Sequence, residues 1–269
     1  MTYSQKLRGL FPDISLGWED LLLLETFQVK YLPGRVAVKE FATLLHTYPV
    51  LYRFLVLKYP PISSFLTGIM EENRPVADAK ENEQHCQEAL WEIADLIIYN
   101  KYPERFDTNA PIRWKMEEIS SICSLEGKVV ADVGAGSGRI AFLVAPLALT
   151  VFAVEPVTSL RSFMKKKALE KGVDNLYIMD GTLDSIPLPD QSLDVLITSN
   201  AIGWNLSEEL HEIQRVLKPG GHAIHLLQAD EKDENPLHET LTSPPWNYNC
   251  LQEKEGNRMK LRYYTLINQ

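Results

Sequence analysis

The sequence predicts an α/β protein with a doubly wound, mostly parallel sheet, closed by a C-terminal antiparallel hairpin and preceded by an all-helical N-terminal region. Two observations predict this fold class. Apolar residues recur at helical spacing before about residue 107, whereas short β-rich apolar runs alternate with amphipathic segments from about residue 108 onward. Such alternation is typical of βαβ units, whose right-handed crossovers build a parallel sheet. We therefore expect two regions, residues 1–107 and residues 108–269.

The first region contains four segments with the apolar spacing of helices. They cover Trp18–Lys30, Val36–His46, Val50–Lys58 and about Lys80–Asn100. The apolar stretch "YPVLYRFLVLKYPPISSFL" is the material that we expect to form a lid and substrate platform, with Tyr52, Phe54, Tyr59 and Phe65 lining a pocket. Two other uses of this region stay open, an interface between two copies of the chain and a plain helical core.

The second region contains the expected strands and helices in alternation. Five apolar runs predict parallel strands, namely "KVVADVG", "TVFAVEP", "NLYIMDG", "LDVLITSN" and "HAIHLLQ", and helices are expected over Ser159–Lys171 and Ser207–Leu217. The runs "WNYNCLQE" and "NRMKLRYYTLIN" flank the short link "KEG", which predicts an antiparallel hairpin. In "RVLKPGG", Pro219 and the two glycines after it predict that a helix ends at Lys218.

Composition excludes several classes of protein. Acidic residues outnumber basic ones by nine among 269 residues, so we expect no broad basic surface for nucleic acid. The three cysteines are far apart and form no CxxC pattern, which predicts neither a disulfide framework nor a zinc site and favours a reducing cytoplasm. His222 and His225 lie three apart on one strand, so they face opposite ways and no metal site is expected. We expect no membrane span, because charges and prolines interrupt the most apolar stretch.

The stretch "VVADVGAGSGR" points to a nucleotide-like ligand. Gly134, Gly136 and Gly138 follow a strand and precede a helix, where a bare turn and a helix N-terminus favour an anionic group. The dinucleotide fingerprint GxGxxG would need a glycine at Arg139, which disfavours an NAD-dependent oxidoreductase. Asp132 lies two residues before the first glycine, where it would repel a diphosphate and attract an ammonium group.

Four motifs in order resemble the class I S-adenosylmethionine (SAM)-dependent methyltransferases. They are "VVADVGAGSGR", "VFAVEP", "DGTLDSIPLPDQSLDVLITSNA" and "LHEIQRVLKPGGHAIHL", and the resemblance covers about residues 111–269. It implies a Rossmann-like fold and SAM as the cofactor. The implied cofactor-binding residues are Asp132, Gly134, Ala135, Gly136, Glu155, Pro156, Asp180, Gly181, Thr182, Asn200 and Ala201.

The resemblance leaves alternatives open at three of these positions. Glu155 is expected to accept the ribose hydroxyls, and the other interpretation is an acidic cap of the next helix. Asp132 either contacts the cofactor or shapes the glycine loop. Relatives carry an acid for the adenine amino group where this chain has Thr182, so either Asp180 binds the adenine from a shifted place or backbone groups do.

The implied activity is methyl transfer to a small-molecule acceptor by in-line displacement. No catalytic base is assigned, because SAM carries an excellent leaving group and only some acceptors need a proton removed. The segment "SNAIGWN" lacks an NPPY-type motif, which counts against methylation of DNA adenine or glutamine nitrogens. Trp204 in this segment is either packing or an aromatic wall beside the sulfonium. Alternative functions are methylation of a protein side chain, a non-catalytic SAM-binding scaffold and, less favoured, an NAD-dependent oxidoreductase.

Overall fold

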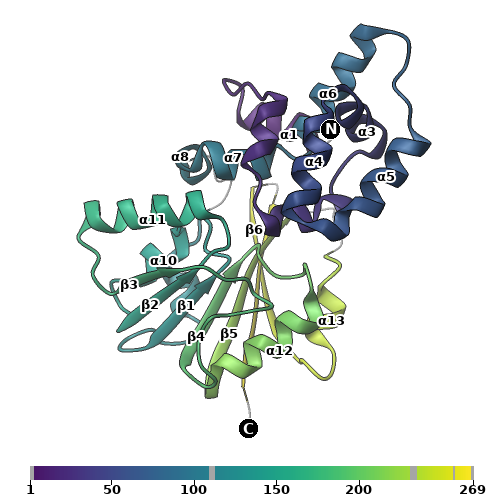
Figure 1. Ribbon diagram of the computed structural model, residues 1–269. Helices are drawn as coiled ribbons and strands as arrows, with labels where there is room; N and C mark the ends of the chain where they lie inside the picture. The colour runs from purple at the N-terminus through teal and green to yellow at the C-terminus, as the bar shows by residue number, and fades with distance from the viewer. Residues whose placement is uncertain (1–2, 109–112, 231–234, 257, 268–269) are drawn as a thin grey trace. The chain divides into compact units, whose positions relative to one another are not determined.

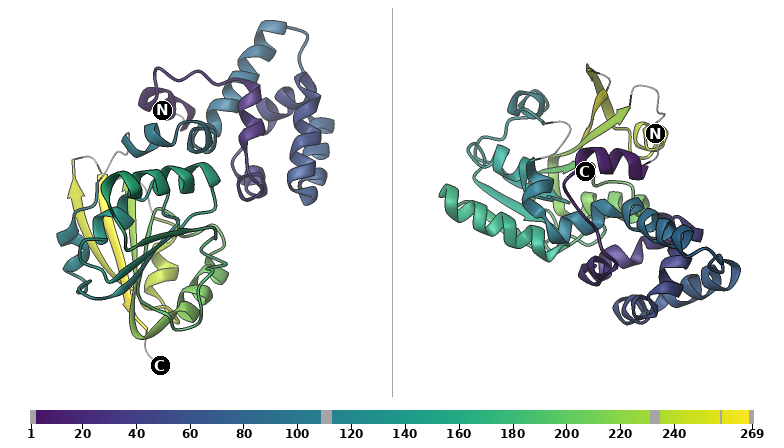
Figure 2. Two further views of the ribbon diagram at one scale, coloured as in Figure 1. Left: turned by 60° about the vertical axis from the view of Figure 1, so that its left-hand side comes forward. Right: turned by 90° about the horizontal axis from the view of Figure 1, so that it is seen from above.

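The computed structural model describes residues 3–108, 113–230, 235–256 and 258–267. The chain divides into two compact units, Met1–Asn109 and Ala110–Gln269. In the described residues of the first unit the regular structure is helical, and the second unit contains the sheet (Figures 1 and 2). No helix in these described ranges is long and apolar enough to cross a membrane.

The first unit is a set of short helices. Its α-helices and 3-10 helices are α1 (Tyr3–Leu10), η1 (Trp18–Leu23), α2 (Thr26–Lys30), η2 (Leu32–Gly34), α3 (Val38–Thr47), α4 (Pro49–Lys58), η3 (Pro60–Ile62), α5 (Ser63–Glu72), α6 (Ala79–Glu92), α7 (Ala94–Lys101) and α8 (Pro103–Thr108). The helix expected over Lys80–Asn100 is interrupted at Ile93, whose φ of −116° and ψ of 22° lie outside the helical range. The helix expected over Trp18–Lys30 is a 3-10 helix followed by a short α-helix.

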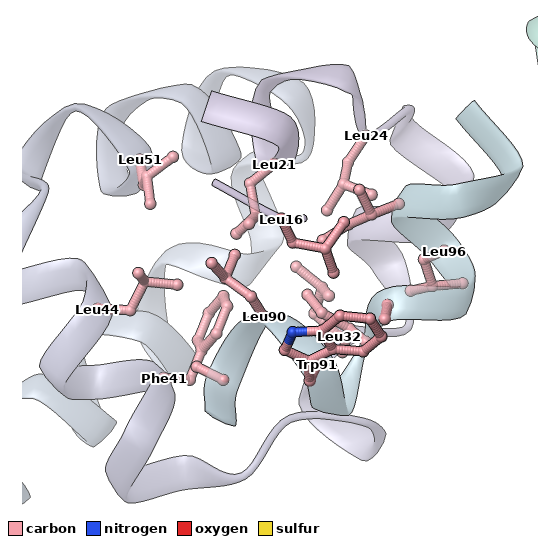
Figure 3. Packing of buried hydrophobic residues seen from close by; sticks show 14 of the residues in the cluster. Leu16, Leu21, Leu24, Leu32, Phe41, Leu44, Leu51, Leu90, Trp91 and Leu96 are labelled. Atoms are coloured by element: carbon pink, nitrogen blue, oxygen red, sulfur yellow. The ribbon is translucent and has the colours of Figure 1, made fainter. Parts of the chain in front are cut away.

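This unit has its own apolar core, which Figure 3 shows from close by. Leucines from η1, α3 and α4, together with Phe41 and Trp91, point into one cluster of buried side chains. The four aromatic residues of the apolar stretch, Tyr52, Phe54, Tyr59 and Phe65, are partly buried against the same cluster. Their packing agrees with a contribution to the core of this unit, and the lid stays a prediction.

The second unit is built on one seven-stranded sheet with the order β3-β2-β1-β4-β5-β7-β6 (Figure 1). The strands are β1 (Val129–Val133), β2 (Thr150–Val154), β3 (Leu176–Met179), β4 (Leu193–Ser199), β5 (Leu217–Asp230), β6 (Asn249–Glu255) and β7 (Arg258–Leu266). Strands β1 to β5 pair in parallel, and β7 runs antiparallel to both β5 and β6. The predicted fold class, with its parallel sheet and terminal hairpin, is confirmed.

Helices cover both faces of this sheet. They are α9 (Met116–Ser120), α10 (Arg139–Val144), α11 (Thr158–Lys171), α12 (Leu206–Val216) and α13 (His238–Thr242). Residues of α9, α10 and α11 share one buried cluster with the sheet, and residues of α12 and α13 share the other. The prediction that α12 extends to Lys218 is wrong. The helix ends at Val216, because Leu217 adopts extended φ and ψ angles and pairs with Leu193 of β4.

Parallel pairing brings the carboxyl ends of β1 to β4 to the same edge of the sheet. Open α/β sheets bind their ligands at this edge, where the strand order reverses. Here the order reverses between β1 and β4. All of the predicted cofactor residues lie at or just after the ends of these four strands.

Candidate functional site

The turn after β1 lies against the loop after β4. Gly134 has a φ of +72°, in the left-handed region that glycine adopts readily. A Cβ atom added to Gly134 would lie 2.3 Å from the Cβ of Ala201, so a side chain at this position would collide with the second loop. The N–H groups of Gly134 and Ala135 both donate to the carbonyl oxygen of Val154, over 2.9 and 3.1 Å. The ends of β1, β2 and β4 therefore meet at this turn.

Asp132 is a buried acid directly before this turn, with 1% of its surface exposed. Its Oδ2 accepts a hydrogen bond of 2.9 Å from the Ala141 N–H in the first turn of α10. Its Oδ1 is buried and has no hydrogen-bond partner among the described residues. Burial is the largest cause that raises the pKa of Asp132 to about 7, and the nearby Glu155 adds to it. A buried oxygen of this kind suits a proton or a cationic group.

Glu155 joins the glycine turn to the start of α11. Its Oε2 accepts from the Gly136 N–H over 2.8 Å, and its Oε1 accepts from the Val157 N–H over 2.9 Å. Only 5% of Glu155 is exposed. The N-cap residue of α11 is Val157, so Glu155 is not itself the N-cap, although its carboxylate accepts from the Val157 N–H. A carboxylate oxygen can accept more than one hydrogen bond, so Glu155 suits a ligand that carries hydroxyl groups. Pro156 lies between Glu155 and Val157, in the segment that the hydrogen bond from Val157 to Glu155 closes.

The segment after β3 contains Asp180, Gly181 and Thr182. The Asp180 carboxylate is 72% exposed and pairs with the Arg161 guanidinium over 3.0 Å. A Cβ added to Gly181 would lie 2.6 Å from Cδ of Pro187, so the backbone packs tightly there. The Thr182 hydroxyl donates to the Asp184 carboxylate. Of the three predicted residues, Asp180 presents the most accessible charge.

Asn200 begins the loop after β4 with a φ of +53°. Its N–H donates to the carbonyl oxygen of Leu226 over 3.0 Å, and its Oδ1 accepts from the Gln228 N–H over 3.1 Å. Both contacts are with β5. They hold Asn200 in the left-handed conformation, which asparagine tolerates better than most residues. The structure thus gives Asn200 a role in shaping the loop, and the predicted contact with the cofactor stays a prediction.

Sequence reasoning missed three residues that organise this edge of the sheet. Arg161 of α11 donates to the Glu155 carbonyl oxygen over 2.7 Å as well as to Asp180. Asp184 accepts from Thr182 and from the side-chain amide of Asn205. Glu209 of α12 accepts from three backbone N–H groups of the loop after β4. The only signal for Glu209 is its place in the first turns of a helix, where acids are common for electrostatic reasons alone.

The geometry defines what kind of ligand fits. Two buried acids, Asp132 and Glu155, lie at the ends of adjacent strands, and the glycine turn between them exposes no side chain larger than a methyl group up to Gly136. Two acids at this place disfavour a diphosphate and favour a ligand that carries hydroxyl groups and positive charge, because a cation nearby stabilises the charged form of a carboxyl group. Oδ1 of Asp132 is buried and has no hydrogen-bond partner among the described residues. A cationic nucleoside such as SAM would supply a partner for it. No group of three or more His, Cys, Asp or Glu side chains in the described ranges is arranged to hold a metal ion.

Comparisons with known proteins agree with this geometry. Residues 131–225 match the family model described as a methyltransferase domain. The chain is 32% identical over 104 residues to the uncharacterized methyltransferase YcgJ of Bacillus subtilis, covering 38% of this chain and 41% of that protein. It is 33% identical over 135 residues to an uncharacterized methyltransferase of Schizosaccharomyces pombe, C25B8.09, covering 49% and 48%. The chain therefore spans less than half of the length of these relatives.

Two solved structures show the extent of the likeness in fold. A SAM-dependent methyltransferase from Aquifex aeolicus shares 19% identity, with a TM-score of 0.47 over 63% of this chain and 92% of that one. The crystal structure of YcgJ shares 28% identity, with a TM-score of 0.38 over 46% and 53%. The family model and the curated relatives thus support a class I SAM-dependent methyltransferase domain around residues 131–225.

Proposed function

We propose that this chain transfers a methyl group from SAM to a small-molecule acceptor by in-line displacement. The observation that carries the proposal is the pair of buried acids, Asp132 and Glu155, on either side of a glycine turn whose Gly136 N–H binds Glu155. A polar ligand with hydroxyl groups matches Glu155, and a positive charge matches the unpartnered Oδ1 of Asp132. SAM carries both.

The predicted residues would each bind a different part of the cofactor. Glu155 would accept the ribose hydroxyls, and Asp132 would neutralise positive charge near the glycine turn of Gly134, Ala135 and Gly136. The segment from Asp180 to Thr182 would face the adenine, and Asn200 and Ala201 would lie nearest to the methyl group. When bound, SAM supplies a methyl group on a sulfonium, which leaves readily. The protein therefore has mainly to orient the acceptor and exclude water.

The small-molecule class of acceptor is supported by charge and by the loop after β4. A net charge of −9 disfavours a broad basic surface for nucleic acid, and "SNAIGWN" offers no paired prolines for a planar amide or base. Two curated relatives are named for different acceptors, a malonyl-[acyl-carrier protein] O-methyltransferase and a ubiquinone/menaquinone C-methyltransferase. The three cysteines are free thiols, which suits a reducing compartment such as the cytoplasm.

Two measurements test the proposal. Calorimetry with S-adenosylhomocysteine and with NADH decides between a methyltransferase and an oxidoreductase, and we expect binding of the first only. Incubation with methyl-labelled SAM and a deproteinised metabolite extract, followed by mass identification, should then show one labelled small molecule. Label found only in a protein fraction would favour a protein side chain as acceptor. SAM binding with no transfer to either fraction would favour a non-catalytic scaffold.

A further inference from the structure

Three consecutive backbone N–H groups in the loop after β4 converge on one carboxylate. Oε2 of Glu209 accepts from the Gly203 N–H over 2.7 Å. Its Oε1 accepts from the N–H groups of Trp204 and Asn205, each over 3.0 Å. A usual helix cap satisfies one or two donors, and its side chain comes from the residue before the helix. Here the carboxylate belongs to Glu209, a residue within α12, and it accepts from all three residues that directly precede the helix.

This carboxylate is almost completely removed from water. Glu209 is 2% exposed, and a buried charge is tolerated only where hydrogen bonds replace its hydration. Burial is the largest influence on the pKa of Glu209 and raises it, while the three N–H groups act in the opposite direction. Hydrogen bonds to a charged acceptor are stronger than those between neutral groups, so the contacts hold the turn firmly.

The rest of the loop is held at two further points. Asn200 is tied to β5 through its N–H and its side-chain oxygen. The side-chain amide of Asn205 donates to Oδ2 of Asp184, in the segment after β3, over 3.3 Å. Among the described residues, the hydrogen bonds of Glu209 come from backbone N–H groups. The Trp204 residue is 39% exposed. The loop is thus fixed along its backbone while its aromatic side chain meets solvent.

We propose that Glu209 is a positioning residue for methyl transfer, because it fixes the loop from Asn200 to Asn205 in the conformation that faces the methyl acceptor. This inference rests on the proposed function. The same loop contributes Ala201, whose side chain lies against the glycine turn at Gly134. Reacting groups misplaced by about 1 Å can lose about 100-fold in rate, so the rigidity of this loop bears directly on transfer. The glycine turn is held by Val154 and Glu155, and Asn200 is held by β5, so cofactor binding should depend much less on Glu209 than methyl transfer does.

The test compares Glu209→Gln with Glu208→Gln in the full chain. Both variants remove one charge from neighbouring positions of α12, but Glu208 is exposed. In Glu209→Gln the amide N–H groups of residues 203–205 should exchange with solvent at least about tenfold faster, because a bond to a charged group is worth more than about 1.4 kcal/mol. Transfer of label from SAM to a metabolite extract should fall by about 100-fold. The Kd for SAM should change by less than about twofold, because the glycine turn and Asn200 keep their own contacts. Glu208→Gln should match the wild type in all three measurements.

The outcomes separate this inference from the proposed function. Unchanged amide exchange in Glu209→Gln would contradict the role of Glu209 in the loop, and faster exchange with full transfer would show that the loop does not position the acceptor. Weakened SAM binding in this variant would also overturn the inference, since it would place Glu209 in support of the cofactor. A wild-type chain that binds no SAM would instead contradict the proposed function. If Glu209→Gln fails to fold, Glu209→Asp takes its place, because it keeps the charge and shortens the reach by one methylene.

Discussion

Two buried acids at the same edge of the sheet have different environments. Both oxygens of Glu155 accept backbone N–H groups, from Gly136 and Val157. Asp132 has one oxygen bonded to Ala141 and one without a partner among the described residues. Glu155 is therefore satisfied as a carboxylate in the free protein. Asp132 is better satisfied when it holds a proton or faces a cation.

Replacement of Glu155 by glutamine should weaken SAM binding by about 1.5–3 kcal/mol, as expected when hydrogen bonds to a charged acceptor are lost. Glutamine keeps the size of the side chain, whereas alanine would also leave the N–H groups of Gly136 and Val157 without their acceptor. Calorimetric titration with SAM measures the effect. Glu170→Gln, on the exposed side of α11, is the matched control. Equal affinity in both variants would remove Glu155 from the cofactor site.

Replacement of Asp132 by asparagine should change how stability depends on pH. The pKa of Asp132 is about 7 in the folded chain, above the value of about 4 of an unfolded chain. The folded state thus keeps a proton that the unfolded state loses, and this contribution to stability is complete below pH 4 and lost as the pH rises through 7. Relative to Asp132→Asn, the wild type should lose up to about 1.4 kcal/mol per pH unit over this window. Urea unfolding of both proteins between pH 5 and 8 measures this, and parallel curves would contradict it.

Some residues at this edge of the sheet could be predicted from the sequence and others could not. Asp132 and Glu155 could be placed because each directly follows or ends an apolar strand, and parallel pairing brings such positions together. Arg161 and Glu209 act on backbone atoms several residues away, which a sequence pattern does not reveal. Their partners depend on how α11 and α12 pack, so tertiary structure alone identifies them.

At the scale of elements, strands were predicted more closely than helix ends. The five runs expected to form parallel strands all contain one, because a buried parallel strand reads as a short continuous apolar run. The end of α12 was misplaced because Pro219 and Gly220 signalled the stop, while Leu217 had already left the helix to pair with Leu193. Strand pairing outweighed the local signal for the end of the helix.

The close approach of two loops predicts a difference between two glycine substitutions. Gly134 and Gly172 both have positive φ angles, +72° and +62°, so alanine at either costs about 1–2 kcal/mol in backbone strain. A Cβ at Gly172 meets open space, whereas a Cβ at Gly134 meets Ala201. Overpacking costs about 1–3 kcal/mol more. We therefore expect Gly134→Ala to lower the affinity for SAM by about ten- to a hundredfold while Gly172→Ala leaves it unchanged, as measured by calorimetry. Loss of affinity in both variants would mean that strain, and not the contact, is responsible.

At the scale of the whole molecule, each unit has an apolar core of its own. The core of the helical unit is drawn from residues 7–98, and the two clusters that cover the sheet are drawn from residues 114–263. All predicted cofactor residues belong to the second unit. The change of apolar period predicts where the chain divides. It does not predict the role of the helices, because residues that pack a core and residues that bind an apolar acceptor are both apolar.

Removal of the helical unit tests its role directly. A chain that begins at Thr108 keeps both clusters of the second unit, so we expect it to fold, as judged by cooperative thermal unfolding. Because it keeps Asp132, Glu155 and the glycine turn, it should bind SAM within about twofold of the full chain. If the helices form the predicted lid and substrate platform, the same protein should lose methyl transfer to the metabolite extract, since a lid excludes water and completes the acceptor site. Full transfer by the shortened chain would make the lid prediction wrong, and an unfolded product would show that the two cores depend on each other. Recovery of transfer when the separate helical unit is added back would assign the loss to the missing helices rather than to damage in the domain that binds SAM.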